Sequence, residues 1–284
     1  MRAPTPRQAR RCLDVAADLL ILWTAARFVA PRLDDDGRLR LSSRLARRTL
    51  ARLGLDVSWS GETGQTTEPM LVVANHVSWL DVYLLNAARP MRFVAKSETR
   101  SWPFVGTIAD RFGSFFIVRG SCRDAARVKG RVADALWAGE SVAVFPEATT
   151  TDGHGVKPFY GAMFQAALDA GVRVQPVAIR YPGPDGRPNP AAAFIDNMTF
   201  ATSLLNVIRE PFLRAELRFG TPLSVAGRTR RELASAAHTI IVDALTKPSA
   251  PLQTRSEPAR KDPPWRALGL RTRRRPSFAL AGGG

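Results

Sequence analysis

The sequence predicts an α/β fold in which a mixed central sheet is flanked by helices, with interfacial helices at the amino terminus. Short apolar runs such as 70–74 and 141–145 are partly β-branched and bounded by polar turns, as expected of buried strands. Segments with the spacing of helices that have one apolar face follow such runs, for example 124–137 and 159–170. This alternation of strands and helices favours an α/β layer architecture. With 284 residues, of which 45% are hydrophobic, the chain can bury one substantial core, so we expect one domain with extensions.

The amino-terminal segment 12–30 is apolar enough to suggest a membrane span. Its longest uncharged run, 19–26, is nevertheless much shorter than the roughly 20 apolar residues that a spanning helix needs. We therefore predict a partly buried interfacial helix and neither a span nor a signal peptide. The next segment, 41–55, places leucines on one half of a helix and arginines on the other. Such a helix can lie on an anionic bilayer or dock on its own domain, and both interpretations stay open.

These patterns divide the chain into three parts. Residues 1–55 are predicted to form membrane-associating helices, and residues 56–246 the folded domain. From about residue 247 the composition shifts to Pro, Arg, Ser and Gly, so 247–284 is predicted to be a basic disordered tail. Its arginine cluster could contact acidic lipids or have no specific partner.

The charge of the chain narrows the possible partners. Its 41 Lys and Arg against 25 Asp and Glu leave a net charge of +16, which suits lipid headgroups, nucleic acid or a phosphorylated cofactor. The basic residues are scattered rather than gathered on a nucleic-acid reading motif, so no nucleic-acid partner is predicted. Cys12 and Cys122 lie far apart and match no metal or redox spacing. We expect reduced thiols and no disulfide.

The stretch from Asn75 to Asp81 is the first candidate site, because it places His76 five residues before Asp81, directly after an apolar strand. Ser78 is predicted as the N-cap of the following helix, with Asp81 at the third helical position. If the chain folds back over the first helical turn, the carboxylate can bond the imidazole. The alternative is that Asp81 is only a capping acid and His76 an ordinary loop histidine.

Polar residues also follow two later strands, at the sheet edge where ligands bind in open α/β folds. Arg119 ends the strand that begins at 115. Its planar guanidinium group can donate two parallel hydrogen bonds to a phosphate. The alternative is an ordinary surface arginine. Glu147, Thr149 and Thr150 follow the strand 141–145.

The two other histidines carry no predicted chemistry. His154 lies in a glycine-flanked loop, and no second histidine is near it in the sequence. His238 follows the Thr229 capping box and is predicted to be a helix surface residue. We therefore predict no zinc site.

The motif N-H-x-S-W-L-D resembles the first block of the glycerolipid acyltransferases, the family of the lysophosphatidic acid acyltransferases. Three further blocks follow in the family's order, ending near residue 181: the strand closed by Arg119, the strand running into Phe145-Pro146-Glu147, and a V-Q-P-V-A-I strand. The resemblance implies a glycerol-3-phosphate acyltransferase-like fold. It also implies that His76 is the general base and Asp81 its orienting acid. The same resemblance implies that four residues bind the acceptor: Arg119, Glu147, Thr149 and Thr150.

The third block departs from the commonest family pattern, because Ala148 replaces a glycine and Thr150 an arginine. This variant is similar to the branch that includes lyso-ornithine lipid acyltransferases, whose acceptor has an amino-acid headgroup without phosphate; that branch also includes proteins acting on lysophosphatidic acid. The expected reaction converts 1-acyl-sn-glycerol-3-phosphate to phosphatidic acid, and the alternative acceptor is lyso-ornithine lipid.

The resemblance further implies an acyl-CoA or acyl-carrier protein donor, whose thioester supplies the activation, so no cofactor or metal is expected. Backbone N–H groups near the helix start are candidates for the oxyanion. The expected location is the cytoplasmic face of the cell membrane, with peripheral or monotopic attachment to an anionic surface. A basic membrane-binding protein without catalysis is the rival from another class. A hydrolase is less favoured, because the sequence has no Gly-x-Ser-x-Gly elbow.

Overall fold

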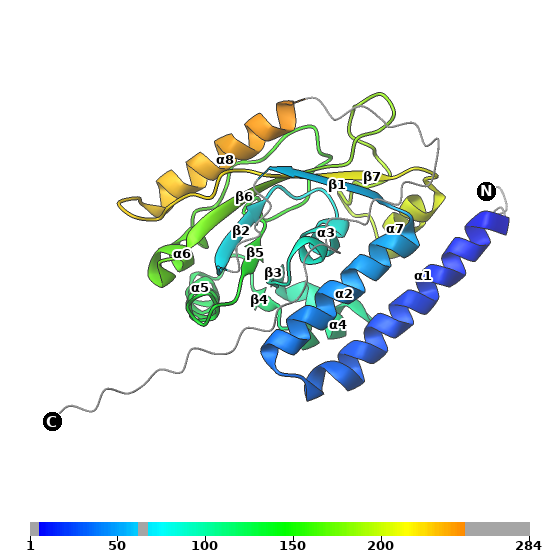
Figure 1. Cartoon of the computed structure of the whole chain (residues 1–284), viewed down its shortest axis with the longest axis horizontal. Coiled ribbons are helices and arrows are strands. Elements are labelled where there is room, and N and C mark those ends of the chain that lie inside the picture. Colours follow the sequence, from blue (N-terminus) through cyan, green and yellow to red (C-terminus); the bar gives the residue numbers. More distant parts are fainter. Residues whose placement is uncertain (1–5, 62–67, 248–284) are drawn as a thin grey trace. The chain divides into compact units, whose positions relative to one another are not determined.

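The computed structural model describes residues 6–61 and 68–247, which belong to a compact unit that spans Met1–Ala250. A seven-stranded sheet with the order β1-β7-β6-β2-β5-β3-β4 lies at its centre. All neighbouring strands are parallel except β6 and β7, which are antiparallel. Figure 1 shows helices on both faces of the sheet, with α5, α6 and α8 on one face and α2, α3 and α7 on the other. The predicted mixed α/β fold is confirmed.

The strands are β1 (Asp56–Gly61), β2 (Met70–Ala74), β3 (Arg92–Lys96), β4 (Phe115–Ile117), β5 (Val142–Val144), β6 (Arg173–Arg180) and β7 (Arg214–Phe219). The α-helices are α1 (Pro6–Thr24), α2 (Asp35–Leu53), α3 (Leu80–Ala88), α4 (Val105–Arg111), α5 (Cys122–Trp137), α6 (Phe164–Ala170), α7 (Phe200–Arg209) and α8 (Arg230–Thr246). Shorter helical segments are η1 (Ala25–Val29), η2 (Ala30–Arg32) and η3 (Ser97–Ser101).

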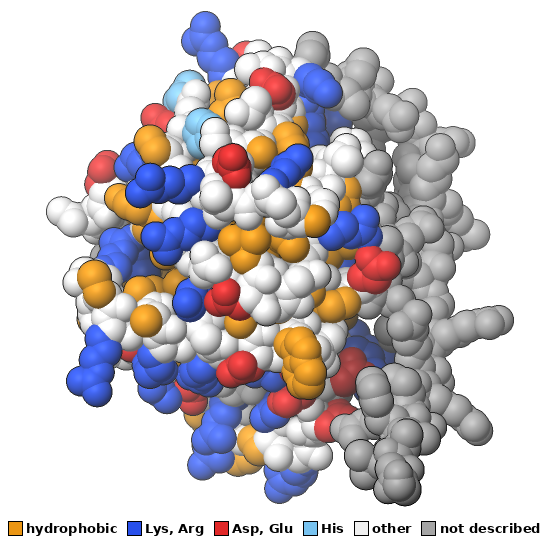
Figure 2. Space-filling view, turned by 90° about the vertical axis from the view of Figure 1, so that its left-hand side faces the viewer, with side chains coloured by type: hydrophobic (Ala, Val, Ile, Leu, Met, Phe, Trp, Pro, Cys, Tyr) orange, Lys and Arg blue, Asp and Glu red, His pale blue; other side chains and the backbone are white. Residues whose placement is uncertain are grey.

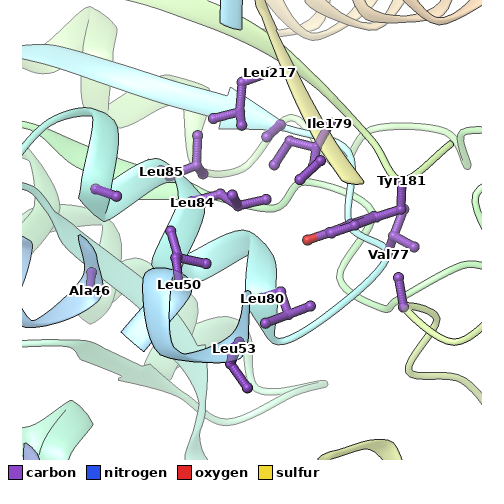
Figure 3. Packing of buried hydrophobic residues seen from close by; sticks show 14 of the residues in the cluster. Ala46, Leu50, Leu53, Val77, Leu80, Leu84, Leu85, Ile179, Tyr181 and Leu217 are labelled. Atoms are coloured by element: carbon purple, nitrogen blue, oxygen red, sulfur yellow. The ribbon is translucent and has the colours of Figure 1, made fainter. Parts of the chain in front are cut away.

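Strand β2 shows how the apolar runs of the sequence build two cores. Side chains of a strand alternate between the two faces of a sheet. Leu71 and Val73 therefore pack in the core under α5, α6 and α8, whereas Val72 and Ala74 pack in the core under α2, α3 and α7. Figure 3 shows part of the second core, in which leucines of α2 and α3 meet side chains of β6 and β7. The turn that follows β2 therefore begins from a strand that is buried on both faces.

The amino-terminal helices pack against the domain. Leu45, Leu50 and Leu53 of α2 are buried, and Arg47 donates a hydrogen bond of 2.8 Å to the carbonyl oxygen of Ala87 at the end of α3. The apolar face of the predicted amphipathic helix thus docks on its own domain, which was one of the two interpretations. Among the helices that the structure describes, none is long and apolar enough to cross a membrane.

A buried carboxylate fixes α1 to α2. Asp18 of α1 is 3% exposed, and it accepts hydrogen bonds from the Arg48 guanidinium at 2.8 Å and from the Thr49 hydroxyl at 2.5 Å. Burial, assisted by the charge of Asp18, raises the pKa of Tyr83 on α3 to about 12. Asp18 of α1 therefore interacts with side chains of both α2 and α3.

We expect Asp18→Ala to lower the free energy of unfolding by about 2 kcal/mol, because it leaves the Thr49 hydroxyl and the Arg48 charge without their acceptor. The matched control is Asp14→Ala on the same helix. Asp14 is 39% exposed, and its nearest cations lie at 3.8 and 3.9 Å. The control should therefore cost about 0.5 kcal/mol or less. Urea unfolding followed by circular dichroism measures both free energies. Equal losses of stability in the two variants would show that the buried hydrogen bonds of Asp18 do not stabilise the fold.

Two predicted helix starts are wrong. Helix α3 begins at Leu80 rather than directly after Ser78, and Ser78 is not its N-cap. Helix α6 begins at Phe164, whereas the apolar pattern predicts a helix from 159. The backbone N–H of Tyr160 donates to the carbonyl oxygen of Pro146 at 3.0 Å, which holds the segment before Phe164 against the β5 loop instead of in a helix.

Candidate active site

The sheet topology brings five strand ends to one edge. Strands β2, β3, β4, β5 and β6 run in the same direction, because each pairs in parallel with its neighbour. Their carboxyl ends therefore meet at the same edge. The residues at or just beyond these ends are His76, Lys96, Arg119, Glu147 and Tyr181.

His76 and Asp81 form a hydrogen-bonded pair. The Nδ1 atom of His76 lies 2.8 Å from Oδ2 of Asp81, whose side chain is fully buried. The same Oδ2 accepts the backbone N–H groups of Val77 at 2.7 Å and Ser78 at 2.9 Å. Asp81 thus caps the turn before α3 and also bonds the imidazole, so the capping role does not exclude the bond to His76. The Ser78 hydroxyl accepts only a weaker bond of 3.3 Å, from the N–H of Leu80.

The pair leaves one nitrogen of His76 for chemistry. Because a carboxylate only accepts hydrogen bonds, Nδ1 must carry the proton that faces Asp81, and the neutral ring then has a free lone pair on Nε2. The ring stacks on Phe145, with centroids 3.9 Å apart and an interplanar angle of 12°. The side chain is 19% exposed and lines a cavity. This arrangement suits a general base.

Tyr181 completes the surroundings of Asp81. Its hydroxyl donates a 2.5 Å hydrogen bond to Oδ1, the carboxylate oxygen that does not face His76. Burial and the charge of Asp81 raise the pKa of Tyr181 well above its usual value, so the hydroxyl remains a proton donor. Figure 3 shows the Tyr181 ring among the buried side chains of the core. Tyr181 is not among the site residues predicted from the sequence, although the strand-end rule that selects Arg119 also applies to it.

We expect Tyr181→Phe to lower kcat by about 10-fold, since it removes a hydrogen bond to a charged group worth roughly 1.5–3 kcal/mol. With one donor fewer, the carboxylate attracts the imidazole proton more strongly. The acid limb of the pH profile of kcat/KM should therefore move to higher pH.

The control is Tyr83→Phe, which removes a cavity hydroxyl without touching Asp81. A Tyr181→Phe profile that falls uniformly at every pH would indicate a purely structural role.

Glu147 holds the backbone around His76. One of its carboxylate oxygens accepts the N–H of His76 at 2.7 Å, and the other accepts the N–H of Lys157 at 2.7 Å. Burial raises the pKa of Glu147, while these hydrogen bonds oppose the shift. The cavity is lined by Pro146 and Ala148 but not by Glu147. The structure thus brings this predicted residue to the site as a support for His76.

The other predicted residues share one cavity with His76. Arg119, Thr149 and Thr150 line a space of about 1470 Å³, together with Lys96. The Thr150 hydroxyl donates to the carbonyl oxygen of Phe194, so its proton is already used. Burial and the nearby charge of Arg119 lower the pKa of Lys96, which places two basic groups close together. Lys96 is not among the site residues that the sequence predicts.

Most of the rest of the cavity wall is apolar, although Glu98, Asp152, Lys157 and Asp196 also line it. The apolar lining includes Leu22, Trp79, Val82, Tyr83, Met91, Phe93, Val105, Ile108, Phe112, Met198 and Phe200. These side chains come from both the amino-terminal helices and the sheet domain. A space lined by a few charged groups and many apolar side chains matches an amphiphile with a charged headgroup and an apolar chain.

The structure differs from the sequence-based expectations for the oxyanion site and for His238. The backbone N–H groups of Val77, Ser78 and Leu80 are engaged with Asp81 and Ser78, so they are not free to bind an oxyanion. His238 is half-buried, with its ring edge-on to Phe159, and is not a plain surface residue. Within residues 6–61 and 68–247, no group of three or more His, Cys, Asp or Glu side chains is arranged to hold a metal.

Comparisons with known proteins agree with this geometry. A family model described as Acyltransferase matches residues 56–180. The chain is 39% identical to the lyso-ornithine lipid O-acyltransferase of Pseudomonas aeruginosa, across 88% of this chain and 96% of that protein. It is 38% identical to the 1-acyl-sn-glycerol-3-phosphate acyltransferase of Neisseria meningitidis, across 57% of this chain and 63% of that protein.

A solved structure has the same fold. The 1-acyl-sn-glycerophosphate acyltransferase of Thermotoga maritima superposes with a TM-score of 0.62 at 22% identity, covering 86% of this chain and all of that one. At this identity the match supports the architecture alone. The sequence blocks, the paired His76 and Asp81, and the extent of the Pseudomonas match lead to one conclusion: this chain belongs to the acyltransferase family.

Proposed function

We propose that the protein transfers a fatty acyl group from a thioester to the hydroxyl of a lysolipid. The observation that carries the proposal is the His76–Asp81 pair, fixed at 2.8 Å at the wall of a cavity that is lined by Lys96, Arg119 and many apolar side chains. The pair supplies a base, and the cavity fits both a charged headgroup and an acyl chain.

In the proposed reaction, Nε2 of His76 removes the proton of the acceptor hydroxyl as its oxygen attacks the thioester carbonyl carbon. Asp81 keeps the ring in the required tautomer and stabilises the imidazolium that forms. When the carbon–sulfur bond breaks, the imidazolium returns the proton to the leaving thiolate. The products are an ester and a free thiol, and the acceptor itself is the nucleophile.

The first candidate acceptor is 1-acyl-sn-glycerol-3-phosphate, giving phosphatidic acid. Arg119 and Lys96 supply two cations for its phosphate, with Thr149 beside them in the cavity lining. The second candidate is lyso-ornithine lipid, whose headgroup carries a carboxylate and an ammonium. Glu98 favours it, because this carboxylate lines the cavity and interacts with the charge of Arg119.

The test is to incubate the purified protein with each acceptor and with labelled acyl-CoA or acyl-carrier protein. Mass spectrometry of the lipid product identifies the acceptor. The first candidate predicts phosphatidic acid, and the second predicts ornithine lipid. If no lysolipid is acylated with either donor, the proposed function is refuted.

We further propose attachment to the cytoplasmic face of the cell membrane, as a peripheral or monotopic protein, through the amino-terminal region 1–55. Trp23 contacts the rings of Phe28 and Phe104, each with its centroid 6.2 Å away. We call Leu20, Phe28, Val29 and Phe104 the apolar patch; all four are exposed. Phe104 also has a positive φ of 61°, which is uncommon for a bulky residue and holds the ring in this position. Residues 56–246 would form the catalytic domain, and most of the predicted tail 247–284 lies outside the described residues.

A further inference from the structure

Asn75 is a buried side chain that the proposed reaction does not use. It follows the last residue of β2, is 1% exposed, and does not line the cavity. Its amide nitrogen donates to the carbonyl oxygen of Ile179 at 2.9 Å, and its amide oxygen accepts the N–H of the same residue at 2.8 Å. A backbone N–H only donates and a carbonyl only accepts, so these partners fix the orientation of the amide. We call the two bonds the Asn75–Ile179 contact.

The contact lies where two neighbouring strands stop pairing. Strands β2 and β6 pair in parallel as far as Ala74 and Val177. Beyond this point the backbone of His76 bonds to the loop after β5, through both its N–H and its carbonyl oxygen. The Asn75 side chain therefore takes the place of backbone groups of β2 and bonds Ile179 of β6. It extends the connection between the two strands past the end of their ladder.

The contact joins the two chain segments that supply the partners of Asp81. Ile179 lies two residues before Tyr181, whose hydroxyl donates to one carboxylate oxygen at 2.5 Å (Figure 3). Asn75 directly precedes His76, whose Nδ1 lies 2.8 Å from the other oxygen. The bond to His76 spans a local turn. The bond to Tyr181 joins residues 100 apart in the chain, so it depends on where the end of β6 lies.

We propose that Asn75 is a positioning residue, which holds the end of β6 so that the Tyr181 hydroxyl reaches Asp81 while the same carboxylate bonds the His76 ring. Asn75 does not touch the substrate and acts through Tyr181. The proposal rests on the proposed function, because that function makes His76 the base. Without the Asn75 amide, two buried backbone groups of Ile179 lose their partners, and the end of β6 can move away from Asp81.

We expect Asn75→Ala to reproduce the effect of Tyr181→Phe on the protonation of His76. With the tyrosine bond weakened, the carboxylate attracts the imidazole proton more strongly, so the ring keeps this proton up to a higher pH. The acid limb of kcat/KM should move to higher pH, and kcat should fall by up to about 10-fold. In the double variant the limb should move no further than in Tyr181→Phe alone, because both substitutions act on one bond.

The protonation of His76 can also be followed without any substrate, from the pH dependence of its ring proton signals in NMR spectra. The chain has three histidines, and His76→Ala identifies the signal of this one. Histidine side chains are exposed on the face that Figure 2 shows, and the exposed His154 supplies a reference signal whose titration should not change. The midpoint of the His76 titration should rise in Asn75→Ala and in Tyr181→Phe, and no further in the double variant.

The matched control is Gln175→Ala, which removes a buried amide from the same strand. Gln175 is 3% exposed, and its amide nitrogen donates to the carbonyl oxygen of Gly220 at 2.5 Å. This variant should lose stability and keep the wild-type titration of His76. If Asn75→Ala does not fold, Asn75→Ser replaces it. Its hydroxyl can bond one of the two Ile179 groups, so the midpoint should rise by a smaller amount.

Four outcomes have a definite meaning. A folded Asn75 variant with the wild-type midpoint would overturn the proposal. Shifts that add in the double variant would show that Asn75 does not act through Tyr181. An equal shift in Gln175→Ala would indicate a general loosening of β6 and would also overturn it. If the wild type acylates no lysolipid, the proposed function fails, whereas the NMR titration still tests the positioning of the ring.

Discussion

His76→Ala should lower kcat for acyl transfer by about 10²- to 10⁴-fold, the range typical of a lost general base. Without the imidazole, the acceptor hydroxyl must attack the thioester while still protonated. The fold should persist, because the His76 side chain lies on a cavity wall and its backbone hydrogen bonds do not need the ring. Steady-state kinetics with a saturating acceptor measure the loss, and circular dichroism checks the fold.

The matched control is His154→Ala, which removes an exposed loop histidine with the same ring. We expect its kcat to stay within about twofold of the wild type, as for most surface substitutions. Near-normal turnover of His76→Ala would contradict the role of the ring as the base. Similar losses in both variants would point to an effect that is not specific to His76.

Asp81→Asn should lower kcat by about 10³-fold or more, although it only replaces one carboxylate oxygen with an NH₂ group. The carboxylate accepts four hydrogen bonds, from His76, Val77, Ser78 and Tyr181. An amide has only one accepting oxygen, so its NH₂ group must face donors. The imidazole would lose its acceptor and could adopt the wrong tautomer.

The same substitution should also destabilise the fold by about 2–3 kcal/mol, because buried donors are left unpaired. Asp134→Asn, at an exposed position of α5, serves as the control and should change neither quantity measurably. Chemical denaturation and steady-state kinetics measure the two effects. An Asp81→Asn protein with native stability and a kcat within 10-fold of the wild type would show that the carboxylate does not orient the base.

The part of the site that the sequence predicts is the part encoded locally. His76 and Asp81 are five residues apart, so a single turn between a strand and a helix brings them together. Tyr181 reaches the same carboxylate from 100 residues further along the chain. That contact depends on β6 lying beside β2, and the order of strands in a sheet cannot be read from hydrophobic patterns.

The same limit applies to the amino-terminal helices. An amphipathic pattern shows that a helix has an apolar face, but it does not specify which surface covers that face. Asp18 interrupts an otherwise apolar segment, and only its contacts with Arg48 and Thr49 explain how a carboxylate can be buried there. The start of α6 was likewise misplaced because its position depends on the contact of Tyr160 with the β5 loop.

The backbone of His76 is held from both sides. Its N–H donates to Glu147, and its carbonyl oxygen accepts the N–H of Thr151 at 2.8 Å. Both partners lie in the loop after β5, so the histidine cannot swing away unless two neighbouring strand ends separate. An enzyme built in this way cannot be switched off by a small displacement of its base.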